Sequence, residues 1–206
     1  MGKIVISENV SLDGVVQDPT GEEGFRHGGW FGRMADKDRL EWTKVEFDEA
    51  LGTEALLLGR RSYEWFAARW PSRSGAWAER LNTLPKYVVS STLVDPEWNN
   101  STVLDGEVVA EISKLKQELD GDIVVYASRR LVRTLLAHGL ADELRLIVHP
   151  VVLGAGERLF GETGDELSLR LLDTRTVGDG LAALTYGIVR DTQGQAPSPS
   201  SRAPEH

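Results

Sequence analysis

The stretch Leu56-Leu57-Leu58-Gly59-Arg60-Arg61-Ser62 joins an uninterrupted apolar run to a glycine, two arginines and a serine. A short apolar run of this kind is typical of a strand that is buried on both faces of a parallel sheet. Gly59 lets the backbone approach a ligand closely, and Ser62 suits the N-terminal cap of a helix, whose free N–H groups favour an anion. Arg60 and Arg61 add guanidinium groups that match phosphate oxygens. The stretch predicts a buried strand ending in an anion-binding turn; the alternative is two arginines on a solvated helix start.

The segments on either side of this stretch alternate between strand-like and helix-like patterns. Strands are predicted near Val5 and at 54–58, 87–89, 103–104, 122–126 and 143–149, and helices at 35–51, 62–70, 108–119 and 128–138. Strands that alternate with helices predict parallel pairing through crossover connections. Segments 167–176 and 181–189 alternate around Val177-Gly178-Asp179-Gly180, which is typical of an antiparallel hairpin.

These patterns predict one α/β domain over residues 1–190. Its central sheet is expected to be mixed but mostly parallel, with helices on both faces and a C-terminal β-hairpin. The tail 191–206 is rich in Pro, Ser and Gln, has almost nothing to bury, and is expected to be disordered.

The composition excludes several classes of function. The 206 residues carry 23 Lys and Arg against 32 Asp and Glu, a net charge of −9, which argues against a nucleic-acid or anionic-membrane surface. The absence of Cys excludes disulfides, thiolate metal sites and Cys nucleophiles. The four histidines are dispersed, so no metal site is expected. No stretch reaches membrane-spanning length, and the expected location is the cytoplasm.

Two further turns support a ligand site at one edge of the sheet. The strand at 87–89 ends in Ser90-Ser91-Thr92, and Tyr126-Ala127-Ser128-Arg129-Arg130 again passes from a strand to a helix. Hydroxyl residues at strand ends are usually only turn formers. Three such turns together suit an extended ligand with several phosphates, such as a dinucleotide. Neither the Walker phosphate loop nor the G-x-G-x-x-G fingerprint is present, so the usual Rossmann site is not expected.

The order of these segments resembles the three-layer dihydrofolate-reductase-like fold, in the branch that includes the reductase domain of bacterial riboflavin biosynthesis. The stretches that carry the resemblance are Ser11-Leu12-Asp13-Gly14-Val15, residues 57–64, Val88-Val89-Ser90-Ser91 and residues 142–160. Together they span residues 3 to about 190.

The resemblance implies an NADPH site. Gly59, Arg60, Arg61 and Ser62 would lie along the cofactor phosphates, and Ser90, Ser91 and Thr92 at the adenosine ribose and its 2′-phosphate. The diphosphate and nicotinamide side would be bordered by Ala127, Ser128, Arg129 and Leu131, and Gly14 and Val15 would contact the nicotinamide. Relatives generally have Gly at the position of Ala127, whose methyl group restricts backbone approach. The preference for NADPH over NADH would depend on Arg61.

The substrate side rests on three candidates. Asp13 is a candidate catalytic and substrate-binding residue that would hydrogen-bond a pyrimidine- or pterin-like ring; equally, it suits an Asx turn beside Gly14. Asp48 lies on the helix that carries the acidic substrate anchor in dihydrofolate reductases, although exposed helix carboxylates are common. Trp30 would stack on a planar substrate ring or anchor its own loop to the core.

The resulting hypothesis is an NADPH-dependent reductase that transfers hydride to a C=N or C=O bond of a small planar heterocycle. The resemblance also implies a homodimer. Two alternatives stay open: a non-catalytic nucleotide-binding module of the same fold, and a structural dimer subunit.

Overall fold

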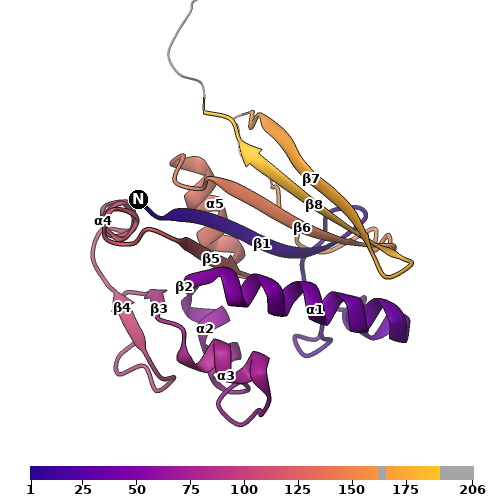
Figure 1. The fold of residues 1–206 in the computed structure, drawn as a ribbon, viewed down its shortest axis with the longest axis horizontal. Coiled ribbons are helices and arrows are strands. Elements are labelled where there is room, and N and C mark those ends of the chain that lie inside the picture. Colours follow the sequence, from indigo (N-terminus) through magenta and orange to yellow (C-terminus); the bar gives the residue numbers. More distant parts are fainter. Residues whose placement is uncertain (162–165, 191–206) are drawn as a thin grey trace, which may run out of the picture.

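The fold is built around one eight-stranded sheet, seen in a computed structural model that describes residues 1–161 and 166–190. The strand order is β4-β3-β2-β5-β1-β6-β8-β7 (Figure 1). The strands are β1 (Lys3–Ser11), β2 (Thr53–Gly59), β3 (Lys86–Val89), β4 (Ser101–Leu104), β5 (Asp122–Tyr126), β6 (Glu143–His149), β7 (Leu169–Val177) and β8 (Leu181–Ile188). In this order, the first six strands, from β4 at the edge to β6, pair in parallel. β8 pairs antiparallel with β6 and forms an antiparallel hairpin with β7. The predicted mixed, mostly parallel sheet is confirmed. The tail predicted from residue 191 onward lies outside the described residues.

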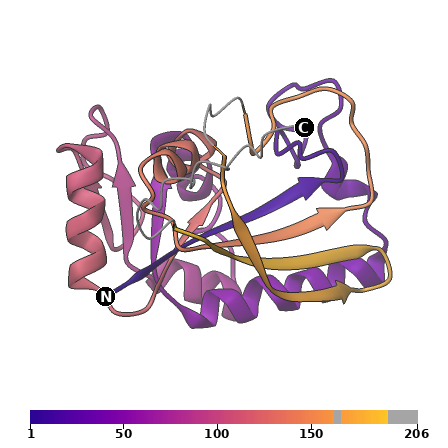
Figure 2. The same cartoon turned by 90° about the horizontal axis from the view of Figure 1, so that it is seen from above.

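Helices cover both faces of this sheet. The helices are α1 (Asp36–Gly52), α2 (Arg60–Ala67), α3 (Ala76–Thr83), α4 (Val108–Glu118) and α5 (Arg129–Ala137). Side chains of α1, α2 and α3 form one hydrophobic cluster with Leu56 and Leu58, whereas α4 and α5 form another with Leu57. Figure 2 shows α1 running lengthwise along the sheet. The apolar run in β2 is therefore continuous because alternate side chains enter two different cores.

Two short elements were not predicted, and one helix has different limits. A 3-10 helix, η1 (Trp30–Arg33), closes the long loop after β1, and α3 follows Gly75. α3 has only eight residues, and Ala78 and Leu81 are its buried positions, which is too little periodicity to detect in a sequence. The helix predicted at 62–70 runs from Arg60 to Ala67.

The topology places a switch point between β1 and β5. These strands are neighbours, and the chain leaves β1 toward α1 on one face and β5 toward α5 on the other. In open α/β sheets, ligands bind outside the carboxyl ends of the strands at such a switch point. The parallel ladder between the two strands ends at the pair Ser7 and Tyr126, so the strands lose their pairing beyond these residues.

Candidate dinucleotide site

Three turns lie at the carboxyl edge of neighbouring parallel strands. They follow β2 at residues 59–62, β3 at 90–92 and β5 at 127–129. Because the sheet order is β3-β2-β5, the carboxyl ends of these strands meet at the same edge. The structure thus brings together the three turns that the sequence analysis singled out.

Two reciprocal hydrogen bonds tie the first turn to the third. The backbone N–H of Gly59 donates to Ser128 Oγ at 2.9 Å, and the N–H of Ser128 donates to Ser62 Oγ at 2.9 Å. The prediction that Ser62 caps its own helix was therefore wrong: α2 begins at Arg60, and its N-cap is Gly59. Ser128 occupies the N-cap position of α5, yet its hydroxyl makes no capping bond there and instead accepts the N–H of Gly59 in the other turn. Both serines make tertiary bonds that local sequence does not reveal.

The second turn is connected to the first through Arg60. Its guanidinium donates to Thr92 Oγ1 at 2.6 Å and pairs with Glu64 Oε1 at 2.7 Å. Ser90 Oγ accepts the N–H groups of Thr92 at 3.2 Å and Leu93 at 3.0 Å, so this hydroxyl forms the turn itself. Ser91 and Thr92 remain exposed at the edge.

The arginines of the site differ in their partners. Arg129 pairs with Glu157, and Arg60 pairs with Glu64. Arg61 is exposed and, within residues 1–161 and 166–190, forms no ion pair. Arg61 is therefore the arginine of the first turn that can meet an anion without displacing a carboxylate.

The β5–α5 turn contains two consecutive left-handed residues that are not glycine. The φ angles are 50° at Ala127 and 59° at Ser128. L-residues adopt this region at a cost, and such outliers concentrate at functional sites. The family that the sequence resembles generally has Gly where this chain has Ala127, and the backbone there has the conformation that glycine favours. Gly59 has a φ of −78°, which residues with a side chain also adopt, so the backbone conformation does not require glycine at this position.

Asp13 holds two loops together. Its carboxylate accepts the N–H groups of Leu153 and Gly154, both at 3.0 Å, and the hydroxyl of Ser11 at 2.8 Å. These hydrogen bonds lower the pKa of Asp13 to about 2, and the bond from Leu153 has the largest effect. Asp13 is thus ionised at neutral pH and cannot donate a proton, which favours the turn-anchoring alternative. Its neighbour Gly14 has a φ of 79°, where glycine is needed.

Val15 lies beside the same junction, and its side chain is fully buried. It forms an isolated antiparallel bridge with Arg158. The two residues proposed at the nicotinamide, Gly14 and Val15, are therefore placed by the contact between the loop after β1 and the segment 151–158.

One acidic side chain that α1 turns toward the sheet is Glu46, which was not among the predicted site residues; Glu49 also faces the sheet and pairs with Arg145 of β6. Glu46 is buried and accepts a hydrogen bond from Asn9 Nδ2 at 3.0 Å. Burial, reinforced by repulsion from Glu49, raises the pKa of Glu46 to about 8. Trp42, Glu46 and Ala50 are spaced by four residues along one helix face, which is the signal that distinguishes Glu46 from Asp48.

Asp48 itself is exposed. It lies at a cleft of about 190 Å³ between α1 and strands β6, β7 and β8. That cleft is separate from the three turns at the carboxyl edge.

Aromatic rings and a histidine fill the space beyond Asn9. His149 Nε2 lies 3.1 Å from Asn9 Oδ1, and burial lowers the pKa of His149 to about 4. The His149 ring stacks on Phe31 with centroids 5.2 Å apart and meets Trp30 edge-on at 4.8 Å. Trp30 is 1 % exposed and donates its indole N–H to Gln17 O, which favours the loop-anchoring alternative for this residue.

Two kinds of feature are missing from the described part of the chain. No cluster of three His, Asp or Glu within it is arranged to hold a metal ion. None of its helices is both long enough and apolar enough to cross a membrane.

Comparisons with known proteins agree with this fold. The chain is 27 % identical over 194 residues to the "Uncharacterized protein YyaP" of Bacillus subtilis (strain 168), covering 89 % of this chain and 94 % of the relative. A putative riboflavin biosynthesis protein from Shewanella sp. PV-4 has a similar structure, with a TM-score of 0.72 at 20 % identity over 91 % of this chain and 99 % of that one.

A dihydrofolate reductase from Enterococcus faecalis, complexed with NADP(H), shares the fold with a TM-score of 0.53 at 14 % identity, covering 90 % of this chain and 96 % of that one. The family model of the RibD C-terminal domain matches residues 2–183. This chain therefore belongs to the RibD C-terminal domain family and has a dihydrofolate-reductase-like fold.

Proposed function

We propose that the protein is an NADPH-dependent reductase. The observation that carries this proposal is the joining of three turns along one sheet edge, through Ser62, Ser128 and the Arg60–Thr92 bond. Such an array suits a ligand with several phosphates better than a single anion. When bound, NADPH would supply hydride from C4 of its nicotinamide.

The residues present fit this cofactor. Neither α2 nor α5 has a side-chain cap, so the first N–H groups of each helix are free for phosphate oxygens. Gly59, Arg60, Arg61 and Ser62 would follow the phosphates, and Ser90, Ser91 and Thr92 would meet the ribose and its 2′-phosphate. The diphosphate and nicotinamide would be bordered by Ala127, Ser128, Arg129 and Leu131, with Gly14 and Val15 beside the ring.

The proposed acceptor is a C=N or C=O bond of a small planar heterocycle, pterin- or pyrimidine-like. Its support is the similarity to a riboflavin biosynthesis protein and to a dihydrofolate reductase. On the substrate side, Asp13 would hold the loop that contains Leu153 and Gly154 in place beside the site. A location in the cytoplasm is part of the same proposal.

A non-catalytic nucleotide-binding module is the second candidate. It is favoured by the full engagement of Asp13 with backbone N–H groups and by the position of Asp48 away from the turns. Both candidates bind the nucleotide, but only the reductase oxidises NADPH in the presence of a reducible heterocycle.

The binding test is a titration of the protein with NADPH and NADH, followed by tryptophan quenching and nicotinamide fluorescence. Arg61→Ala removes the unpaired guanidinium. We expect the Kd for NADPH to rise about tenfold or more, because hydrogen bonds to charged groups contribute about 1.5–3 kcal/mol. Arg170→Ala on β7 is the matched control and should bind normally. If neither NADPH nor NADH binds saturably, the proposed function is ruled out.

A further inference from the structure

Glu157 supplies a carboxylate to the third turn of the candidate dinucleotide site. It forms an ion pair with Arg129, the first residue of α5. Glu157 lies after β6, in a part of the chain that is distant in sequence from this turn. The third turn therefore holds an anion that the protein itself provides.

The start of α5 favours an anion for two reasons. The hydroxyl of Ser128 makes no capping bond to the helix, and the first turn of α5 contains no acidic residue, so the helix N-terminus has no local negative partner. The side chain of Arg129 is only 19 % exposed, and a partly buried charge is screened by water and salt much less than an exposed one. Arg129 and the helix N-terminus thus attract the same negative group.

The backbone of Glu157 is bonded to the loop that follows β1. Its N–H donates to Gln17 Oε1 at 3.1 Å, and its carbonyl accepts the N–H of Val16 at 3.0 Å. The next residue, Arg158, donates from Nε to the carbonyl of Asp13 at 3.0 Å. The backbone position of Glu157 is therefore held by contacts that do not involve Arg129.

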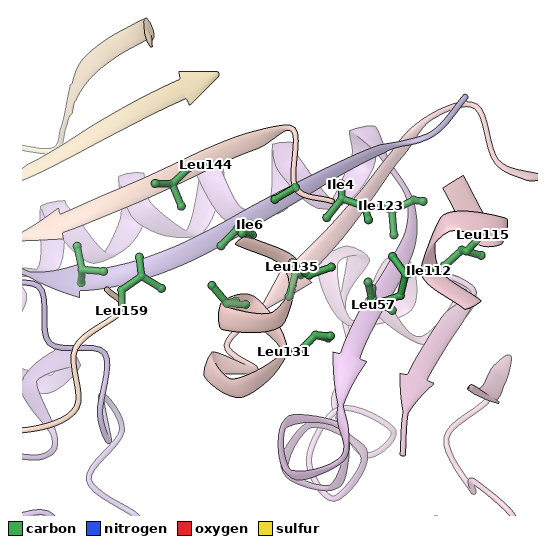
Figure 3. Close-up of a cluster of buried hydrophobic side chains, with 14 residues drawn as sticks. Ile4, Ile6, Leu57, Ile112, Leu115, Ile123, Leu131, Leu135, Leu144 and Leu159 are labelled. Atoms are coloured by element: carbon green, nitrogen blue, oxygen red, sulfur yellow. The ribbon is translucent and has the colours of Figure 1, made fainter. Parts of the chain in front are cut away.

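A hydrophobic contact holds the same segment beside α5. Leu159 is 1 % exposed and belongs to the hydrophobic cluster that contains Leu131 and Leu135 of α5, as the close-up in Figure 3 shows. The side chain of Glu157 is itself 51 % exposed. Its carboxylate can thus turn into solvent and release Arg129 while the backbone stays in place.

A phosphate would use the same groups at this turn. A guanidinium and a helix N-terminus bind phosphate oxygens through the same charge-assisted hydrogen bonds that they offer to a carboxylate. We infer that Glu157 competes with the diphosphate of the cofactor for Arg129, neutralising the turn in the free protein and leaving it when NADPH binds. This inference rests on the proposed function. Glu157 thereby lowers the affinity for the cofactor and favours its release.

The test is the Kd of Glu157→Gln for NADPH, measured by tryptophan quenching at one ionic strength. Gln keeps the size of the side chain but removes the charge, so Arg129 becomes free for a phosphate. The Kd for NADPH should fall about two- to fivefold, which is the range that the loss of an exposed ion pair corresponds to. Adenosine 2′-phosphate, which has no diphosphate, should bind the parent protein and the variant equally.

Two further variants separate competition from a general effect of charge. Glu118→Gln removes an acid that pairs with Lys114 on α4, so it makes the same change in net charge and should leave the Kd for NADPH unchanged. In an Arg129→Ala background, Glu157→Gln should give no gain in affinity, because the group for which the two anions compete is absent.

The outcomes separate this inference from the proposed function. Unchanged or weaker NADPH binding by Glu157→Gln would overturn the competition, as would a gain that persists without Arg129 or extends equally to adenosine 2′-phosphate. If neither the parent protein nor Glu157→Gln binds NADPH, the proposed function itself fails. Thermal unfolding of each variant confirms that it is folded.

Discussion

At the scale of single residues, the contacts of a carboxyl decide its chemistry. The pKa of Asp13 is lowered, whereas the pKa values of Glu46 and Glu8 are raised. Backbone donors stabilise the Asp13 anion, whereas burial favours the neutral forms of Glu46 and Glu8. Asp13 therefore contributes to the architecture of the site rather than to proton transfer.

Asp13→Asn should destabilise the protein at neutral pH by about 1–3 kcal/mol, because a charged acceptor of two N–H groups becomes a neutral amide. The pKa of Asp13 is lowered to about 2 in the folded protein, so its stabilisation is present above the unfolded pKa and disappears as pH falls toward 2. Urea unfolding at pH 7, 4 and 2.5 should show the difference between parent and variant shrinking.

Asp105→Asn is the control for this measurement, since Asp105 is exposed, and should lie within about 0.5 kcal/mol of the parent. A difference for Asp13→Asn that stays constant from pH 7 to 2.5 would contradict the anchoring role.

At the scale of elements, the N-termini of α2 and α5 form one unit. Each turn supplies a serine hydroxyl to a backbone N–H of the other, and neither hydroxyl caps its own helix. The left-handed conformations of Ala127 and Ser128 bring Ser128 into this position. The two anion-binding turns are thereby held in a fixed relative position before any ligand arrives.

Ser62→Ala and Ser128→Ala should each lower the free energy of unfolding by about 1–2 kcal/mol, since each leaves a backbone N–H without its partner. The double variant should lose less than the sum, because the second bond is weakened once the first is gone. Urea unfolding measures the cycle, and NADPH titration should show weaker binding in both single variants.

Ser113→Ala in α4 provides the comparison, because the Ser113 hydroxyl donates to Val109 O within its own helix. It should change stability by no more than about 0.5 kcal/mol. Strict additivity of Ser62→Ala and Ser128→Ala would show that the two turns are independent.

At the scale of the whole molecule, β7 is an edge strand with an exposed apolar surface. Leu169, Leu171 and Leu172 are 36 %, 52 % and 47 % exposed. Long apolar edges promote association, and soluble proteins normally cover or charge them. We propose that a second copy of the chain covers β7, in agreement with the homodimer that the family resemblance implies.

Replacing Leu171 and Leu172 with Lys should convert the protein to a monomer without unfolding it, because both side chains already contact solvent in the single chain. Light scattering after size exclusion measures the mass. Leu40→Lys, on an exposed position of α1, should leave the mass unchanged. A parent protein that is monomeric at all concentrations would contradict the proposal.

The sequence alone determined the order and type of most elements, the two-sided burial of Leu56, Leu57 and Leu58, and the terminal hairpin. These features follow from periodicity and turn residues, which are local properties of a chain. The short helix α3 was missed because its eight residues carry too few buried positions to produce a recognisable period.

Only the tertiary structure decided the partners of the polar groups. Ser62 accepts a hydrogen bond from the β5–α5 turn instead of capping its own helix, and Asp13 holds a loop 140 residues away. Within the described part of the chain, Glu8 Oε1 is buried without a hydrogen-bond partner. These outcomes depend on which strands become neighbours and on what each side chain meets across them. The buried strand at Leu56–Leu58 could be predicted because an uninterrupted apolar run is a local property of the sequence, whereas the ligand site depends on contacts between distant turns.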